Sequence, residues 1–247
     1  MIKDIEFIIK KLFFKESYLL KKRLIRAINK NYEKELEIIE RYADKTKDAL
    51  DIGVYRGVYT YKLSKFFKTV HSFEPNPLLY PYLEKNLNKI IKNLKLYNLA
   101  LSDRNGETEL KLPTRSKSIF NDNIEELFQL GAATMHPNNY VNNYKKVPIT
   151  MRKLDDIRIE NKIGFIKIDV EGHEKNVFLG GLETIKRNKP VLLIEIEQKH
   201  TKKPVEQTIN FIKSHNYNAF VYRNNELIEF KENNINRKEI NYIFIQR

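Results

Sequence analysis

The segment DIGVYRG, Asp51 to Gly57, begins at the end of the short apolar run Ala49–Ile52 and precedes an amphipathic stretch, Thr60–Lys68. A short strand, a glycine turn and a helix in this order are typical of the first unit of a nucleotide-binding α/β fold. Glycine lets the backbone turn sharply and approach a ligand closely. A dinucleotide site would carry G-x-G-x-x-G, but Tyr55 stands where the second glycine would fall. The turn therefore favours a cofactor without a pyrophosphate, such as S-adenosylmethionine, which carries a sulfonium and an amino acid instead.

Outward from this turn, short apolar runs alternate with helical patterns. The alternation predicts a largely parallel sheet with helices on both faces, a doubly wound fold. Ligands of such sheets bind beyond the carboxyl ends of the strands, so candidate site residues are sought there. The predicted strands cover 70–73, 94–101, 164–170, 191–197, 219–222, 227–230 and 242–245, and the predicted helices include one through Val177, Leu182 and Ile185 and one over Val205–His215.

Two segments stand apart from this alternation. Residues 1–44 carry apolar side chains at helical spacing, and we expect them to form a helical cap or an oligomerisation segment, for example in a homodimer. Basic residues on their polar face leave peripheral contact with an anionic membrane open. Residues 113–146 show little periodicity and are too long for an ordinary connection, so we expect a substrate loop within a single domain over 45–247.

Composition limits the chemistry that the chain can perform. Its 247 residues include no cysteine, which excludes disulfides, thiolate metal sites and cysteine nucleophiles. The formal net charge of +13 would attract polyanions such as RNA, anionic lipid or a phosphorylated substrate, although the lysine excess also fits a compositional bias along the chain. No apolar run is long enough to span a membrane and no signal peptide is recognisable, so we expect a cytoplasmic protein.

An acidic residue follows the second predicted strand. Glu74 lies in the segment FEPNP, 73–77, at an offset from the glycine turn where a carboxylate can accept hydrogen bonds from both ribose hydroxyls of an adenosine cofactor. Asp51 is expected to orient the glycine loop and to attract the ammonium group of the cofactor. The alternative for Glu74 is an acid placed at a helix N-terminus, where the helix dipole favours it.

With these motifs in place, the chain resembles the FkbM-type family of class I S-adenosylmethionine-dependent methyltransferases. The resemblance runs from about residue 48 to the C-terminus, and IKIDVEGHE, 166–174, is its most specific motif. It implies the seven-stranded, mostly parallel, Rossmann-like sheet of that class and O-methyl transfer to a sugar, glycan or secondary metabolite. The further matching segments are DIG with Gly57, FEPNP, NLALSD with Gly106, KLDDI over 153–157, and the strand that ends at Glu195.

The same resemblance places the remaining candidate site residues. Asp169 would face the methionine part of the cofactor or the methyl acceptor. With Glu171 and His173 it forms the predicted catalytic group, in which His173 is the general base because its ordinary pKa lies near neutrality. The predicted cofactor-binding residues, including those expected beside the adenine, are Asp51, Gly53, Gly57, Glu74, Asn98, Leu99, Ala100, Ser102 and Asp169.

Several alternatives remain open at this point. Asp169, Glu195 and Glu197 could hold a divalent cation, but acids also occur at strand ends without a metal, so no metal site is predicted. His136 in the expected substrate loop and His200 after the fifth strand are undecided. The other functional classes are a nicotinamide-dependent oxidoreductase and a non-catalytic basic module that binds RNA or a membrane. We favour a small-molecule or glycan acceptor, with or without a phosphate group, over a nucleic acid.

Overall fold

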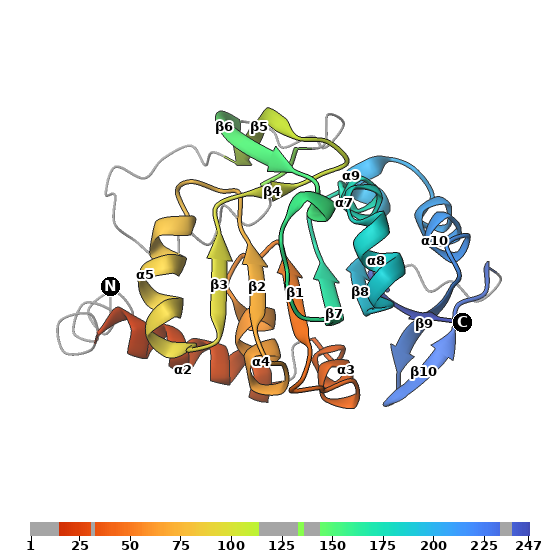
Figure 1. Cartoon of the computed structure of the whole chain (residues 1–247), viewed down its shortest axis with the longest axis horizontal. Coiled ribbons are helices and arrows are strands. Elements are labelled where there is room, and N and C mark those ends of the chain that lie inside the picture. The colour runs from red at the N-terminus through yellow and green to blue at the C-terminus, as the bar shows by residue number, and fades with distance from the viewer. Residues whose placement is uncertain (1–14, 31–32, 114–132, 136–143, 233–238) are drawn as a thin grey trace, which may run out of the picture.

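A computed structural model of the chain describes residues 15–30, 33–113, 133–135, 144–232 and 239–247 (Figure 1). Its strands are β1 (Asp48–Ile52), β2 (Val70–Phe73), β3 (Leu94–Tyr97), β4 (Ala100–Leu101), β5 (Gly106–Pro113), β6 (Tyr144–Arg152), β7 (Ile163–Ile168), β8 (Val191–Glu195), β9 (Tyr217–Arg223), β10 (Glu226–Glu229) and β11 (Asn241–Gln246). Its helices are α2 (Glu16–Asn29), α3 (Leu36–Arg41), α4 (Val58–Phe66), α5 (Tyr80–Ile90), the 3₁₀ helix η2 (Leu154–Asp156), α7 (Glu174–Gly180), α8 (Leu182–Asn188), α9 (Gln198–Thr201) and α10 (Val205–Lys213).

The main sheet has the strand order β10-β9-β11-β8-β7-β1-β2-β3. The five strands from β8 to β3 pair in parallel, while β11 is antiparallel to both β8 and β9. The doubly wound α/β prediction is therefore confirmed. The sheet contains eight strands rather than seven, because the hairpin after β9 adds β10 at the edge.

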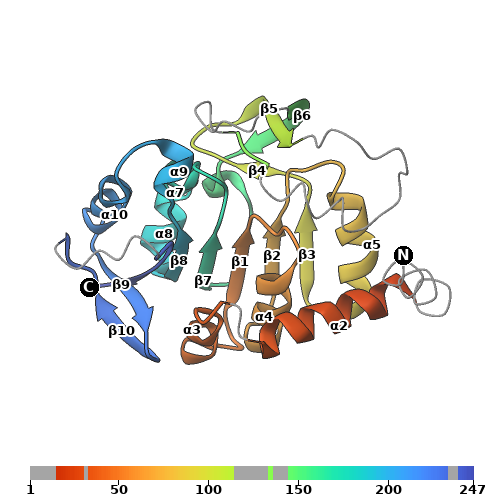
Figure 2. The same cartoon turned by 180° about the vertical axis from the view of Figure 1, so that it is seen from behind.

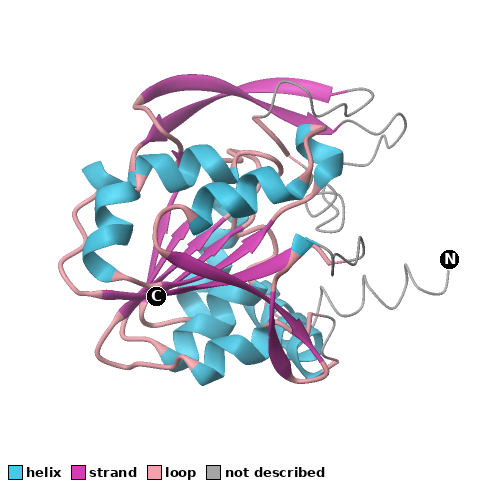
Figure 3. Ribbon diagram, turned by 90° about the vertical axis from the view of Figure 1, so that its right-hand side faces the viewer, coloured by secondary structure: helices cyan, strands magenta, loops and turns pink. Residues whose placement is uncertain are grey.

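Helices cover both faces of the sheet, as the continuous burial of β1 requires. Leu50 and Ile52 point to the face that packs against α7, α8 and α10, whereas Ala49 points to the face covered by α3 and α4. Figure 3 shows these two helical layers on either side of the strands. This alternation of side chains along a strand explains why a run of consecutive apolar residues is buried.

The structure corrects two predicted element boundaries. The expected strand 94–101 is divided, because β3 ends at Tyr97 and β4 leaves the main sheet to pair with β6 in a second, three-stranded sheet of order β4-β6-β5. Figure 1 shows this small sheet above the carboxyl ends of the main strands. The expected single helix after β7 consists of α7 and α8, and a Cβ added to Gly180 at their junction would lie 1.8 Å from the carbonyl oxygen of Ser102.

The N-terminal helix α2 lies against α4 and α5 (Figure 2). Its buried Leu20 and Leu24 join a cluster with Leu83 and Leu87 of α5, and Glu16 forms an ion pair of 3.2 Å with Lys85. Residues 1–14 lie outside the described residues, so the proposed role of 1–44 stays a prediction. No helix in the described part of the chain is long and apolar enough to cross a membrane.

Candidate active site

A cavity of about 400 Å³ lies at the carboxyl ends of β1, β2, β7 and β8. This size lies within the range of pockets that hold small molecules and cofactors. We call it the first cavity. Its described lining residues are Glu33, Ile52, Gly53, Tyr55, Phe73, Glu74, Pro75, Leu79, Leu99, Ala100, Leu101, Leu110, Ala133, Met135, Asp169, Val170, Glu171 and Glu195.

The glycine turn after β1 forms one wall of this cavity. Gly53 has φ +92°, and a Cβ at this position would lie 1.8 Å from the carbonyl oxygen of Asp169. Only glycine lets the β1 and β7 exits approach this closely. Gly57, with φ +79°, precedes α4 and packs against Leu87, so it shapes the turn without lining the cavity.

Glu74 connects the second strand to the glycine turn. Its Oε2 accepts a hydrogen bond from the backbone N–H of Tyr55 and its Oε1 accepts one from Asn76, both at 3.0 Å. Burial raises the pKa of Glu74 to about 7 despite these two hydrogen bonds. Because each carboxylate oxygen has a further lone pair, Glu74 can hold the loop and still accept hydrogen bonds from a ligand in the cavity.

Asp51 is placed behind the cavity rather than on its wall. Its buried carboxylate accepts a hydrogen bond from the hydroxyl of Thr60 in α4 and does not contribute to the lining of the first cavity. This arrangement fits the expected role of orienting the loop. Contact between the Asp51 carboxylate and the ammonium group of a cofactor stays a prediction.

Three further acids line the cavity from β7 and β8. Asp169 and Glu171 follow β7, and Glu195 ends β8. Burial, reinforced by the charge of Asp169, raises the pKa of Glu195 to about 8, and burial also raises the pKa of Asp169. The buried Lys167 beneath them donates a hydrogen bond to Asn241 at 3.2 Å and partly offsets this accumulation of negative charge.

His200 was undecided from the sequence, and the structure places it beside this acidic group. Its Nε2 lies 2.7 Å from Glu171 Oε2 and 3.4 Å from Glu197 Oε1. Burial lowers the pKa of His200, but the hydrogen bond and charge of Glu171 outweigh it and raise the pKa above the ordinary value. Glu171 is therefore oriented by an imidazole while it lines the cavity.

His173, the predicted general base, lies elsewhere. It caps α7, and its Nε2 lies 2.9 Å from the hydroxyl of Ser102, which follows β4. Neither residue lines the first cavity. The turn after Glu171 directs the imidazole toward the second sheet. That His173 faces the transfer point and that Ser102 contacts the adenine stay predictions.

The segment expected beside the adenine is only partly at the cavity. Leu99 and Ala100 line it, whereas the Asn98 side chain donates a hydrogen bond of 2.8 Å to the backbone oxygen of Glu74. Asn98 instead lines a separate cavity of about 620 Å³, which we call the third cavity and which is also lined by Arg152 and Arg158. His136 and most of the expected substrate loop lie outside the described residues.

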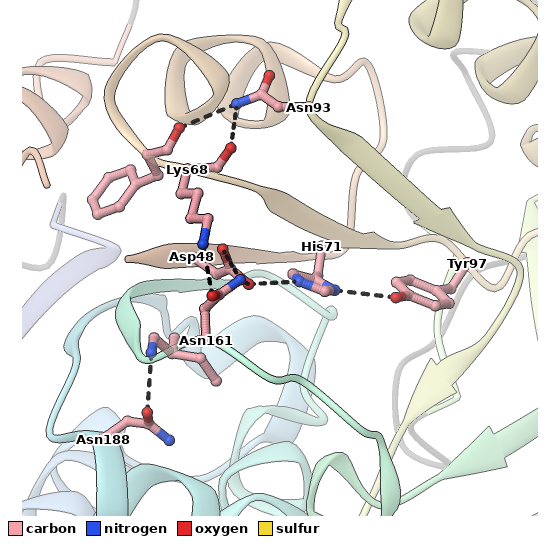
Figure 4. A network of polar contacts seen from close by, with 9 residues as sticks. Asp48, Lys68, His71, Asn93, Tyr97, Asn161 and Asn188 are labelled. Carbon is pink, nitrogen blue, oxygen red and sulfur yellow. Dashed lines mark hydrogen bonds and ion pairs between the residues drawn. The ribbon is translucent and has the colours of Figure 1, made fainter. Parts of the chain in front are cut away.

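Another buried histidine, His71, belongs to a polar network that links the amino ends of β1 and β2 with Tyr97, the last residue of β3 (Figure 4). His71 lies 3.1 Å from a carboxylate oxygen of Asp48 and 3.1 Å from the hydroxyl of Tyr97. Burial lowers the pKa of His71 although Asp48 opposes the shift. This network connects β1, β2 and β3, and none of its three residues lines the first cavity, which indicates a structural role.

The acids of the site do not form a recognisable metal centre. Among the residues that the structure describes, no group of three or more His, Asp or Glu side chains is arranged to hold a metal ion. Sequence reasoning missed Glu33 and Tyr55 as lining residues. Glu33 approaches through the turn between α2 and α3, a long-range contact that no local motif signals.

The strand order, with its antiparallel β11 between β8 and β9, and the cavity at the carboxyl ends of β1 and β2 together define the class I methyltransferase fold. The chain belongs to the FkbM methyltransferase family, since the profile described as "Methyltransferase FkbM domain" matches residues 51–219.

Individual relatives are more distant. The 2-O-methyltransferase NoeI of Sinorhizobium fredii is 29% identical over 126 residues, which are 47% of this chain and 49% of the relative. The chain thus spans about half the length of this curated relative. Among solved structures, methyltransferase FkbM from Methylobacillus flagellatus KT shares 15% identity with a TM-score of 0.49, over 81% of this chain and 44% of that one. An rRNA methylase from Streptococcus thermophilus shares 11% identity with a TM-score of 0.47, over 86% and 93% of the two chains.

Proposed function

We propose that the first cavity binds S-adenosylmethionine and that the chain transfers its methyl group to a hydroxyl of a sugar, glycan or secondary metabolite. The observation that carries this proposal is the acidic composition of the cavity wall. Five carboxylates line it, and its described lining contains no lysine or arginine, although the whole chain has a formal net charge of +13. Such a site favours a cation.

The charge of the wall also weighs against the nicotinamide alternative. The pyrophosphate of a dinucleotide would bring negative charge toward Glu74, Asp169 and Glu195, without a described cationic side chain on the wall to receive it. The ammonium and sulfonium groups of S-adenosylmethionine complement the same acids. The O-methyl specificity is supported by the name of the curated relative, a 2-O-methyltransferase.

The lining residues would have different roles in such a site. Glu74 would accept hydrogen bonds from the ribose hydroxyls, while Leu99 and Ala100 would contact the adenine. Asp169 and Glu195 would attract the cationic methionine end. When bound, the cofactor would supply the methyl group to the acceptor oxygen, with the electron pair of the broken carbon–sulfur bond left on sulfur and the hydroxyl proton released.

Glu171 would receive that proton at its carboxylate, with His200 holding the carboxylate in place. Positioning of the acceptor oxygen supplies most of the acceleration in this class of reaction, and proton removal is the smaller contribution.

Calorimetry with Glu74→Gln tests the cofactor assignment. The amide leaves one acceptor oxygen and loses the charge, so we expect at least a tenfold loss of affinity for S-adenosylmethionine, since a hydrogen bond to a charged group contributes about 1.5–3 kcal/mol.

Glu174→Gln is the matched control. Glu174 is equally buried, its pKa is also raised by burial to about 7, and it accepts a hydrogen bond from the backbone N–H of Gly172, but it does not line the cavity. Equal losses in both variants would assign Glu74 a purely structural role. Tight binding of NADH, with no response to S-adenosylmethionine in the unmodified chain, would overturn the proposed function.

A further inference from the structure

A second cavity, of about 670 Å³, lies next to the first. The two share four lining residues, which are Glu33, Gly53, Tyr55 and Asp169. The third cavity, in contrast, shares only Leu99 with the first, on the side proposed for the adenine. The second cavity therefore borders the first at Asp169, the residue proposed to attract the methionine end of the cofactor.

The two neighbouring cavities differ in charge. Arg23, Arg26 and Arg56 line the second cavity, and the only acids among its described lining residues are the shared Glu33 and Asp169. The acids thus lie at the boundary and the arginines beyond it. A ligand that complements these charges would carry a negative group near the arginines, at a distance from its own atom that contacts the cofactor.

The arginines are supplied by elements whose positions are fixed. Arg23 and Arg26 lie three residues apart on α2, a spacing that puts both on one face of the helix. Leu20 and Leu24 anchor that helix in the apolar cluster with α5. Arg56 belongs to the glycine turn itself.

Tyr55 is one of the residues that line both cavities. Its backbone is in the left-handed region, with φ +47°, and the hydrogen bond from its N–H to Glu74 holds it there. The guanidinium of Arg56 lies over its ring, 4.9 Å from the ring centre. A non-glycine residue held in this conformation beside a ligand cavity is typical of a functional position.

We propose that the second cavity binds the methyl acceptor and that this acceptor carries a phosphate or a carboxylate, which Arg23, Arg26 and Arg56 hold. The inference rests on the proposed function, because it requires the cofactor in the first cavity. Guanidinium groups recognise both anions through paired hydrogen bonds. The acceptor hydroxyl would reach the cofactor past Tyr55, beside Asp169.

Titration of the full chain with three sugars tests the proposal. The protein is first saturated with S-adenosylhomocysteine, and glucose 6-phosphate, glucuronate and uncharged glucose are then titrated by calorimetry in a buffer without phosphate. We expect at least one anionic sugar to bind at least tenfold more tightly than glucose. The phosphate and carboxylate arms identify which anion the cavity prefers. The double variant Arg23→Gln/Arg26→Gln should lose at least tenfold of that affinity.

The matched control is Arg152→Gln/Arg158→Gln, which removes the same charge from the wall of the third cavity and should leave the affinity within twofold of the unmodified chain. Melting temperatures confirm that the variants fold.

An equal response to all three sugars, including no response to any of them, overturns the proposal. A loss of S-adenosylhomocysteine affinity in Arg23→Gln/Arg26→Gln also overturns it, because the arginines would then bind the carboxylate of the cofactor. Failure of the unmodified chain to bind S-adenosylhomocysteine in the first titration marks failure of the proposed function instead.

Discussion

At the scale of single residues, the candidate site separates side chains that the sequence places together. Glu171 and His173 are two positions apart, yet Glu171 faces the first cavity and His173 faces Ser102. The positive φ of Glu171, +56°, and that of Gly172, +101°, turn the chain between them. Glu171 in turn pairs with His200, which lies in another element. Neighbours in sequence therefore have different environments and different chemistry.

This separation predicts different effects for two substitutions. Glu171→Gln keeps the shape of the side chain but removes the proton acceptor, so we expect methyl transfer to slow by at least about tenfold, toward the range of about 10² to 10⁴ typical of a general base. His173→Ala should change the rate by less than that. Transfer of labelled methyl from S-adenosylmethionine to a panel of sugars and sugar phosphates measures both rates, and cofactor affinity is determined alongside. The opposite order of effects would return the role of base to His173.

The sequence is informative about residues whose role follows from the local chain. Gly53 and Glu74 could be predicted because a glycine turn and an acid after the next strand have fixed places in a doubly wound sheet. Tyr55 could be seen only as a departure from a dinucleotide motif. Its position between two cavities depends on α2, which is remote in sequence. The direction of the Asp51 carboxylate toward Thr60 likewise depends on how α4 packs on β1.

At the scale of elements, the site depends on how closely the exits of β1 and β7 approach each other. Backbone hydrogen bonds continue past both strand ends, from Gly53 to Phe73 and from Asp169 to Ile52. The contact between Gly53 and the carbonyl of Asp169 closes the floor shared by the two cavities. A side chain at Gly53 would separate the strand ends and so disturb both cavities.

Gly53→Ala tests this requirement. The left-handed backbone and the backbone clash together should lower the free energy of unfolding by at least about 2 kcal/mol. Gly106→Ala provides the comparison: Gly106 also has a positive φ, +143°, but a Cβ there would meet no atom within 4 Å, so only about 1 kcal/mol is expected. Urea unfolding measures both values. Similar losses in the two variants would show that backbone conformation, rather than close approach of the strands, makes Gly53 necessary.

The elements also show where sequence periodicity has limits. Strand and helix types were predicted correctly around β1, β2, β7 and β8, whose apolar runs are bounded by clear turn residues. The division between β3 and β4 was not predicted, because Leu94 to Leu101 is continuously compatible with a strand. Only pairing of Ala100 and Leu101 with Met151 and Arg152 separates them, and such pairing joins positions distant in sequence.

At the scale of the whole molecule, acidic and basic side chains are unevenly distributed. The chain is strongly basic, yet carboxylates gather around the first cavity. Burial raises the pKa of Glu74 to about 7 and that of Glu195 to about 8, and it raises the pKa of Asp51, behind the cavity, to about 7. A cation in the cavity would lower these pKa values, since it favours the charged form of each carboxyl. Cofactor binding and proton release are therefore expected to be coupled.

The raised pKa values predict an unusual dependence of stability on pH. Without a ligand, the folded protein keeps protons on Asp51, Glu74 and Glu195 that the unfolded chain has already released above its ordinary carboxyl pKa. Stability must then fall as pH rises through this interval. One unit of pKa displacement corresponds to about 1.4 kcal/mol, so a decrease of about 2 kcal/mol or more is expected between about pH 5.5 and about pH 8. Thermal and urea unfolding across that interval measure this decrease.

Glu195→Gln should flatten the decline in stability, because the amide does not titrate. Saturating S-adenosylmethionine should also reduce the decline, because it stabilises the deprotonated acids. If the ligand-free protein instead becomes more stable over the same interval, these carboxyl groups are already ionised in the folded state before the cofactor binds.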